Sequence, residues 1–388
     1  ACQSITFAHM KHLHIIIFTL FLWSCKQSSA PQKPNDHMVK IVLDTEEPLP
    51  EKDTIFLSGN IPALGLWNPK GLAMKKRAET RWEQTFPVSD SGHHLEFKFT
   101  LGSFDREAIS NRGIIPGNSI LEVARDTEVY FVIEDFKNPM APLMLSSGKA
   151  EIKLFHPTNG LADRKITVWL PEGYRKDATI RYPVIYVHDG QNQFDSTKTF
   201  NHQEWKLDET IHSLSMLGKI STPIVIAIDN TDARTMEYGS VIKESPYADF
   251  IIKQVKPWVD SMYRTFSDRK HTATMGSSMG GLIALNLAWY HDDTFSGAAC
   301  LSPAFKIDQF DILKEIKKYE GPKKNINLYV DAGTEGLESK LRPGIDETVQ
   351  YLKTKGYQIN YQIIQGAEHN EAAWAKRVEK PLIQFFGK

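Results

Sequence analysis

The chain has 388 residues, of which 41% are hydrophobic and 24% are charged, and its formal net charge is −1. This length and composition predict a globular protein with more than one domain. The balanced charge gives no electrostatic case for nucleic acid or an anionic membrane surface as a partner. Cys2, Cys25 and Cys300 lack C-x-x-C or metal-type spacing, so neither a disulfide framework nor a zinc site is expected.

The first 34 residues are interpreted as an export signal and a polar tether. A basic start after Met10 leads into an apolar stretch from Ile15 to Trp23, followed by small and polar residues. This layout is typical of a signal sequence, is too short for a spanning helix, and makes Met10 the expected start. The segment "LWSC" resembles the lipobox of bacterial lipoproteins, which implies lipidation of Cys25. We therefore expect a protein of the bacterial cell envelope, periplasmic or at the surface, attached to the membrane through a lipid. The alternative is a cleaved signal with an incidental cysteine.

Residues 35–138 have the pattern of an immunoglobulin-like β-sandwich. Short apolar or alternating runs, such as "VKIVLD", "TIFLSG", "WEQTFPV" and "EVYFVIED", are separated by clusters of turn-forming residues. The stretches "SGNIPALGLWNPKGLAM" and "EFKFTLGSFDREAISNR" resemble starch-binding carbohydrate modules. That resemblance implies that Trp67 stacks on a sugar ring, although a second platform tryptophan is missing and Phe104 is the nearest aromatic residue. Glycan binding and a purely structural sandwich both remain open.

Residues 139–150 are predicted to be a linker, and residues 151–388 an α/β domain. The linker contains two prolines and a cluster of small residues. An antiparallel start, "EIKLFHP" and "RKITVWLP", precedes buried strands such as "YPVIYVHDG", "TPIVIAIDN" and "NINLYVDAG", with helical segments between most of them. This alternation predicts a mostly parallel sheet flanked by helices. Within the helical pattern of "SPYADFIIKQVKPWVDSMY", Pro257 is expected to cause a kink or a break.

The stretch "TATMGSSMGGLIAL" contains a G-x-S-x-G motif centred on Ser278. A strand pattern precedes it and an alanine- and leucine-rich helix pattern follows, which is the context of a nucleophile elbow. Gly276 and Gly280 leave room for the strained turn, and Gly281 allows the helix to approach the strand closely. We therefore expect Ser278 to be the nucleophile and Ser277 to point away from the cleft.

A serine nucleophile needs a histidine base that is held by an acid. In an α/β-hydrolase fold the order along the chain is serine, acid, histidine. His369 follows a strand pattern and precedes a helix pattern in "IIQGAEHNEAAW", which makes it the expected base. The acid should lie in the loop "GTEGLESK", where Glu338 is favoured and Glu335 is the alternative. The backbone amides of Met279 and Gln191 are the expected oxyanion donors.

The segments "VHDGQNQFD", "GSSMGGLIAL", "CLSPAF" and "GAEHNEAAW" together resemble the Putative esterase family of α/β-hydrolases. That family includes feruloyl and acetylxylan esterases, siderophore esterases and S-formylglutathione hydrolases. The resemblance implies hydrolysis of carboxylic esters through an acyl-enzyme, without a metal or cofactor. Asn192, Tyr238 and Trp374 are expected to line the pocket, with core packing as the alternative for the last two.

The functional hypothesis is a serine carboxylic ester hydrolase. Its substrate would be a small-molecule or oligosaccharide ester, such as an ester-linked glycan or natural product in the cell envelope. Two alternatives remain at this stage. One is a glycan-binding lipoprotein whose hydrolase domain is inactive, and the other is an acyltransferase built on the same fold.

Overall fold

The computed structural model describes residues 36–89, 94–110, 116–199 and 201–388. The predicted export signal and Cys25 lie outside these ranges. The chain divides into two compact units, Ala1–Ala141 and Pro142–Lys388, which are described separately. In the described ranges, no helix is both long enough and apolar enough to cross a membrane.

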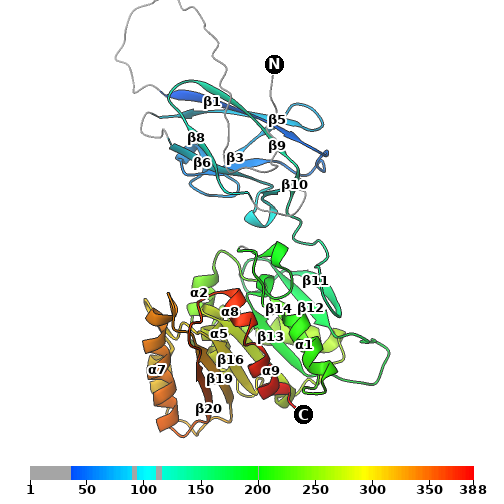
Figure 1. Cartoon of the computed structure of the whole chain (residues 1–388), viewed down its shortest axis with the longest axis vertical. Coiled ribbons are helices and arrows are strands. Elements are labelled where there is room, and N and C mark those ends of the chain that lie inside the picture. The colour runs from blue at the N-terminus through cyan, green and yellow to red at the C-terminus, as the bar shows by residue number, and fades with distance from the viewer. Residues whose placement is uncertain (1–35, 90–93, 111–115, 200) are drawn as a thin grey trace, which may run out of the picture. The chain divides into compact units, whose positions relative to one another are not determined.

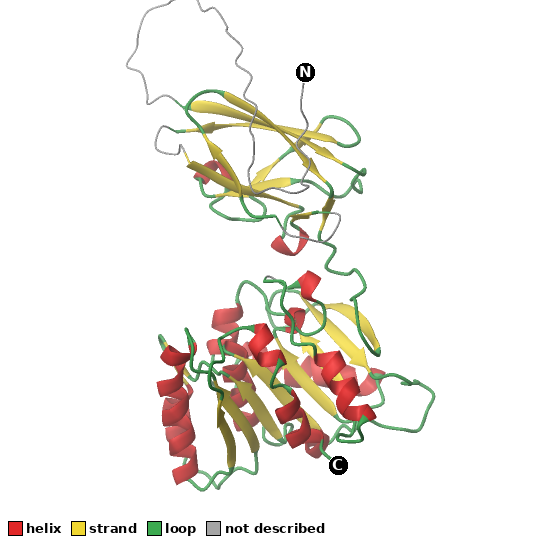
Figure 2. Ribbon diagram, in the orientation of Figure 1, coloured by secondary structure: helices red, strands yellow, loops and turns green. Residues whose placement is uncertain are grey.

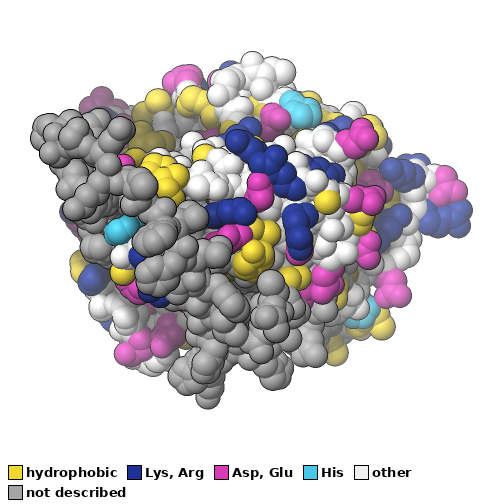
Figure 3. All heavy atoms as spheres, turned by 90° about the horizontal axis from the view of Figure 1, so that it is seen from above, with side chains coloured by type: hydrophobic (Ala, Val, Ile, Leu, Met, Phe, Trp, Pro, Cys, Tyr) yellow, Lys and Arg dark blue, Asp and Glu magenta, His cyan; other side chains and the backbone are white. Residues whose placement is uncertain are grey.

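The first unit is a β-sandwich, as predicted (Figure 1). One sheet has the order β4 (Lys75–Lys76), β5 (Arg81–Val88), β1 (His37–Thr45) and β9 (Thr127–Ile133). The other has the order β3 (Leu72–Ala73), β2 (Phe56–Gly59), β6 (His94–Thr100) and β8 (Ser119–Glu122), and β7 (Ala108–Ile109) pairs with β10 (Asp135–Phe136). Inward residues alternate along the strands, such as Val39, Ile41 and Leu43 of β1, and form one core with Phe97 and Phe99 of β6. Acidic and basic side chains are interspersed on the face shown in Figure 3.

The predicted linker is shorter than expected, because most of residues 139–150 belongs to the second unit. The Met144 amide donates to Asp195 Oδ2 (3.0 Å), and the Ser146 and Ser147 amides donate to Asp208 Oδ2 (2.8 and 3.2 Å). Leu143 and Leu145 also pack against the core of that unit. The composition of the segment resembles a free linker, but its amides have fixed acceptors.

The second unit contains an eight-stranded sheet (Figure 2). The order is β11 (Lys149–Phe155), β12 (Arg164–Leu170), β14 (Ile224–Ile228), β13 (Val184–His188), β15 (Thr272–Ser277), β16 (Gly297–Leu301), β19 (Asn327–Ala332) and β20 (Ile359–Ile363). The first two neighbouring pairs are antiparallel and the other five are parallel. A short hairpin joins β17 (Lys306–Ile307) and β18 (Phe310–Asp311). The predicted α/β class with an antiparallel start is confirmed.

Helices cover both faces of this sheet. One face is covered by α1 (Leu207–Met216), α8 (Glu371–Ala375) and α9 (Glu379–Phe386). The other is covered by α2 (Arg234–Gly239), α3 (Pro246–Phe250), α4 (Lys256–Met262), α5 (Met279–Tyr290), α6 (Ile312–Lys317) and α7 (Glu338–Thr354). Strand side chains alternate between the two cores: Val184 and Tyr186 face one, and Ile185 and Val187 face the other. This arrangement is the three-layer architecture of an α/β-hydrolase.

Pro257 interrupts the regular helical hydrogen bonding, as expected, but without ending the helical path. A π-helical segment, Ile251–Val255, joins α3 to α4, and Pro257 lies in the first turn of α4. A proline at this position removes an amide that would otherwise donate inside the helix, and the wider π turn accommodates the ring.

Candidate active site

The candidate site lies at the carboxyl edge of the parallel strands. Ser278 follows β15, Ser302 follows β16 and the Gly333–Glu338 segment follows β19, while His369 lies in the loop after β20. Because neighbouring parallel strands end at the same edge, these four segments all lie along that edge.

Ser278 occupies a strained turn between β15 and α5. Its φ and ψ are 55° and −124°, values that a residue with a side chain rarely adopts. Its amide donates to the Leu301 carbonyl (3.1 Å) and its carbonyl accepts from the Ala304 amide (2.9 Å), so the neighbouring β16 segment holds the turn. The Ser278 residue is half-buried, whereas Ser277 is 5% exposed. This is the geometry of a nucleophile elbow centred on Ser278.

Two glycines make room for this turn. A Cβ atom on Gly276 would lie 2.5 Å from the backbone of Gly280, and one on Gly281 would lie 2.8 Å from Pro303 Cβ. Both distances are well below a normal contact between carbon atoms. The glycine spacing in the motif therefore reflects close packing of β15, α5 and the segment after β16.

His369 forms a hydrogen-bonded pair with the buried Glu338. His369 Nδ1 lies 3.1 Å from Glu338 Oε1, and the two side chains are 11% and 0% exposed. Glu338 Oε2 accepts from the Gly333 amide at 2.9 Å. Burial raises the pKa of the Glu338 carboxyl, but hydrogen bonds from His369, Ser302 and the Gly333 amide outweigh it and leave that pKa below its usual value. The alternative acid, Glu335, is exposed and accepts instead from Thr334 Oγ1 (2.9 Å).

The two amides predicted as oxyanion donors both lie at the start of a helical turn. Met279 is the first residue of α5, and Gln191 lies in the 3-10 turn Gly190–Asn192 after β13. Amides in such a first turn have no acceptor within the helix and are free to bind an anion. Their role as oxyanion donors stays a prediction.

The Gln191 turn is fixed by a residue that the sequence did not single out. Asp189 has a φ of 57°, and its carboxylate accepts two bonds from Arg234, to Oδ1 and Oδ2 (both 2.7 Å). Asn230 Nδ2 donates to the same Oδ1 at 2.6 Å. Arg234 is the first residue of α2, so an ion pair joins that helix to the turn. The sequence signal for Arg234 was its position in "NTDARTMEYG", directly after the end of a buried strand.

The three predicted pocket residues have different positions. Tyr238 is 0% exposed and packs with His188 and Tyr247, so the expectation that it lines the pocket is wrong and the core alternative holds. Trp374 is 4% exposed and belongs to the core under α8, so the core alternative holds for it as well. Its ring packs edge-on against His369, with ring centroids 5.0 Å apart. Asn192 is half-buried, and its Nδ2 donates to Glu371 Oε1 at 3.1 Å.

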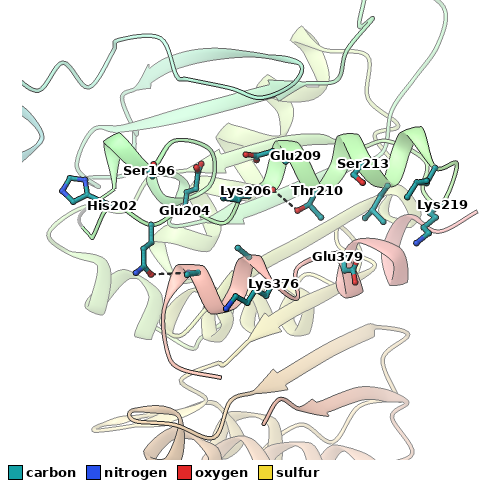
Figure 4. Close-up of a pocket in the computed structure, with 15 residues that line it drawn as sticks. Ser196, His202, Glu204, Lys206, Glu209, Thr210, Ser213, Lys219, Lys376 and Glu379 are labelled. Carbon is teal, nitrogen blue, oxygen red and sulfur yellow. Dashed lines mark hydrogen bonds between the residues drawn. The ribbon is translucent and has the colours of Figure 1, made fainter. Parts of the chain in front are cut away.

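A separate groove of about 780 Å³ lies between α1 and the α8–α9 segment (Figure 4). Glu204 and Glu209 line its α1 side, and Lys376 and Glu379 line the other. Burial, followed by repulsion from neighbouring carboxylates, raises the pKa of Glu204 to about 7. Glu204 Oε2 is buried and has no hydrogen-bond partner among the described residues.

The raised pKa predicts an effect of pH on stability. The Glu204 carboxyl has a pKa of about 7 in the folded state and about 4.3 in the unfolded chain, so the folded state holds its proton more tightly. The stabilisation that results is complete below about pH 4.3. This stabilisation is lost as pH rises through 7, where a buried charge must form. Because Glu204 is half-buried, solvent screening reduces this effect to about 1 kcal/mol. The Tm of Glu204→Gln relative to wild type should therefore rise by about 2–4 °C between pH 5 and pH 8. Glu379→Gln, which changes an exposed carboxylate of the same groove, should show no such gain. A constant difference for Glu204→Gln across this range would contradict the prediction.

Comparison with known proteins gives two family matches. The Putative esterase model matches residues 161–385, and the starch binding domain model matches residues 38–127. An endo-1,4-beta-xylanase/feruloyl esterase from Xylanibacter ruminicola is 23% identical over 339 residues, which is 84% of this chain and 43% of that protein. The chain thus spans less than half the length of that relative.

Solved esterase structures share the fold. A ferulic acid esterase has a TM-score of 0.51 and 19% identity, over 61% of this chain and 97% of its own. The enterobactin esterase from Shigella flexneri, solved with enterobactin, has a TM-score of 0.51 and 16% identity, over 91% of this chain and 94% of its own. The predicted combination of an esterase fold with a starch-binding-like sandwich is therefore confirmed.

Proposed function

Since the chain belongs to the Putative esterase family, we propose that it hydrolyses carboxylic esters with Ser278, His369 and Glu338 as its catalytic triad. The observation that carries this proposal is the hydrogen-bonded pair of His369 and the buried Glu338, which lies at the same edge of the sheet as the strained Ser278 turn. An inactive relative would have no need to keep a strained serine, a base and an acid together.

In the proposed mechanism, His369 Nε2 removes the proton of Ser278 Oγ as that oxygen attacks the ester carbonyl. Glu338 accepts a hydrogen bond from the Nδ1–H of His369 and stabilises the imidazolium that forms. The Met279 and Gln191 amides bind the oxyanion of the tetrahedral intermediate, which collapses to an acyl-enzyme as His369 protonates the leaving alcohol. Water activated by His369 then releases the acid. If an alcohol replaced water in this last step, the enzyme would be an acyltransferase.

The proposed substrates are esters carried on glycans. The relative from Xylanibacter ruminicola is named for xylanase and feruloyl esterase functions, and the first unit matches a starch binding domain. We further propose that the protein is exported and held in the cell envelope by a lipid on Cys25, a location that suits such a substrate. The test is a kcat/KM comparison among feruloylated and acetylated xylan oligosaccharides, a catecholate siderophore and S-formylglutathione. We expect the xylan esters to react fastest. A siderophore or thioester preferred by about tenfold would overturn the substrate class, and inactivity on every ester would favour the glycan-binding alternative.

We also propose that the sandwich binds glycan through Trp67. This side chain is half-buried on a turn with a φ of 65°, which the bond from the Trp67 amide to the Gly59 carbonyl (2.8 Å) fixes. Losing one aromatic platform should weaken binding by about 10- to 100-fold. We expect Trp67→Ala to lose retention on insoluble starch or xylan, while Tyr130→Ala, a change at an exposed aromatic on β9, is retained like wild type. Equal retention of wild type and Trp67→Ala would leave the sandwich a structural role.

A further inference from the structure

Glu371 joins two segments that flank the candidate site. It is the first residue of α8 and lies two residues after His369. Its Oε1 accepts a hydrogen bond from Asn192 Nδ2 at 3.1 Å, and its Oε2 accepts one from Asn201 Nδ2 at 2.7 Å. These two asparagines lie 179 and 170 residues away along the chain. One carboxylate therefore ties the segment after β13 to the helix that follows the proposed base.

The bond from Asn192 acts on the turn that carries the Gln191 amide. Asn192 is the last residue of that 3-10 turn and directly follows Gln191. The Asn192 amide donates to the Asp189 carbonyl at 3.0 Å, and the Asn192 carbonyl accepts from the Trp205 amide at 2.9 Å. At the start of the same turn, the Asp189 carboxylate is held by Arg234. The Gln191 amide thus lies between two anchors, one on α2 and one on α8.

The anchor on α8 is itself held in place. Trp374 of α8 packs against both His369 and Trp205, with ring centroids 5.0 and 5.8 Å apart. A carboxylate that accepts from two side-chain amides makes charge-assisted hydrogen bonds, which are stronger than those between neutral groups. Glu371 is half-buried, so water competes less for these bonds than it would at a fully exposed position. A shift of the turn relative to the base would therefore have to break a strong contact.

We propose that Glu371 is a positioning residue for the oxyanion hole: by fixing Asn192, it sets the position of the Gln191 amide relative to the base, His369. The amide has to meet the oxyanion as it forms, and a displaced donor stabilises that oxygen less. Glu371 acts through Asn192 and takes no part in the chemical steps. This inference rests on the proposed esterase function.

The test is a double-mutant cycle on kcat that combines Glu371→Ala with Asn192→Ala. We expect each single variant to lower kcat by about 10- to 50-fold and to change KM by less than about threefold, because the lost interaction acts in the transition state. The double variant should lose no more than about threefold beyond either single variant, since both changes remove the same bond.

Glu368→Ala is the matched control for this cycle. Glu368 is an exposed carboxylate in the loop that carries His369, and its Oε2 accepts from Asn370 Nδ2 at 3.0 Å. It makes the same kind of bond close to the base, but to a neighbour in its own loop. Its replacement should leave kcat unchanged.

Three further measurements separate this role from a general loss of structure. Glu371→Gln keeps a carbonyl oxygen that can accept from Asn192, so its kcat should stay within about fivefold of wild type. A trifluoromethyl ketone, whose adduct with a catalytic serine places an oxyanion in the hole, should bind Glu371→Ala about 10- to 50-fold more weakly. In Asn192→Ala, which removes no charge, the pH midpoint of kcat should match wild type because His369 is undisturbed.

Several outcomes would overturn the inference while the esterase function stands. They are additive losses in the double variant, an unchanged kcat or an effect on KM alone in Glu371→Ala, and a Glu371→Gln variant as impaired as Glu371→Ala. Unchanged affinity for the ketone, or a shifted pH midpoint in Asn192→Ala, would overturn it as well. A wild-type protein that hydrolyses no ester and does not react with a fluorophosphonate would instead overturn the proposed function.

Discussion

Ser278→Ala is expected to lower kcat for a chromogenic acetate ester by on the order of a million-fold, by analogy with other serine hydrolases. The reason is that no other group at the elbow can form the acyl-enzyme, so the oxyanion amides and substrate binding alone remain to assist attack by water. The measurement is steady-state hydrolysis by purified wild-type and variant protein, together with Tm to show that the variant is folded.

The adjacent serine provides the control for this variant. Ser277 has the same side chain one residue earlier, but it belongs to β15 and is 5% exposed. Ser277→Ala should therefore keep kcat within about threefold of wild type, since it removes no group from the proposed triad. Wild-type hydrolysis by Ser278→Ala would show that Ser278 is not the nucleophile.

Glu338→Gln is expected to lower kcat by about 10³- to 10⁴-fold, with little change in KM. A glutamine amide can present its NH₂ group to His369 Nδ1 and so favour the wrong tautomer of the imidazole. It also removes the negative charge that stabilises the imidazolium. Glu338 Oε2 accepts a hydrogen bond from the Gly333 amide, and the carbonyl oxygen of a glutamine can accept the same bond. The variant should therefore keep the fold.

Glu335→Gln is the matched control for the acid. Glu335 lies three residues earlier, in the loop that precedes α7, and its side chain is exposed. Its replacement should change kcat by less than about threefold, as expected for a surface position without a catalytic contact. A larger loss in Glu335→Gln than in Glu338→Gln would assign the acid to Glu335.

The parts of the site that depend on local pattern could be predicted from the sequence. The elbow at Ser278 is specified by glycines at fixed spacing between a strand and a helix, and these are local constraints. His369 is the predicted base because it lies between a strand and a helix at the expected edge. The order serine, acid, histidine along the chain limits the candidate acids to one loop. The choice between Glu335 and Glu338 depended on which side chain turns inward, and the sequence of a loop does not determine that.

Other features depend on contacts between distant segments. Ser302 and Arg377 are 75 residues apart and become partners when the loop after β16 meets the α8–α9 segment. Tyr238 was assigned to the pocket because an aromatic residue suits either a pocket or a core, and tertiary packing decided for the core. The linker was predicted too long because its amides find carboxylate acceptors far along the chain, at Asp195 and Asp208.

The most direct test of the proposed function is to map the adduct formed with a fluorophosphonate probe. Peptide mass spectrometry of the labelled wild-type protein should place a single adduct on Ser278. His369→Ala should slow the labelling by orders of magnitude, because the serine then lacks its base. An adduct on a different residue, or labelling of the His369→Ala variant at the wild-type rate, would contradict a catalytic Ser278–His369 pair.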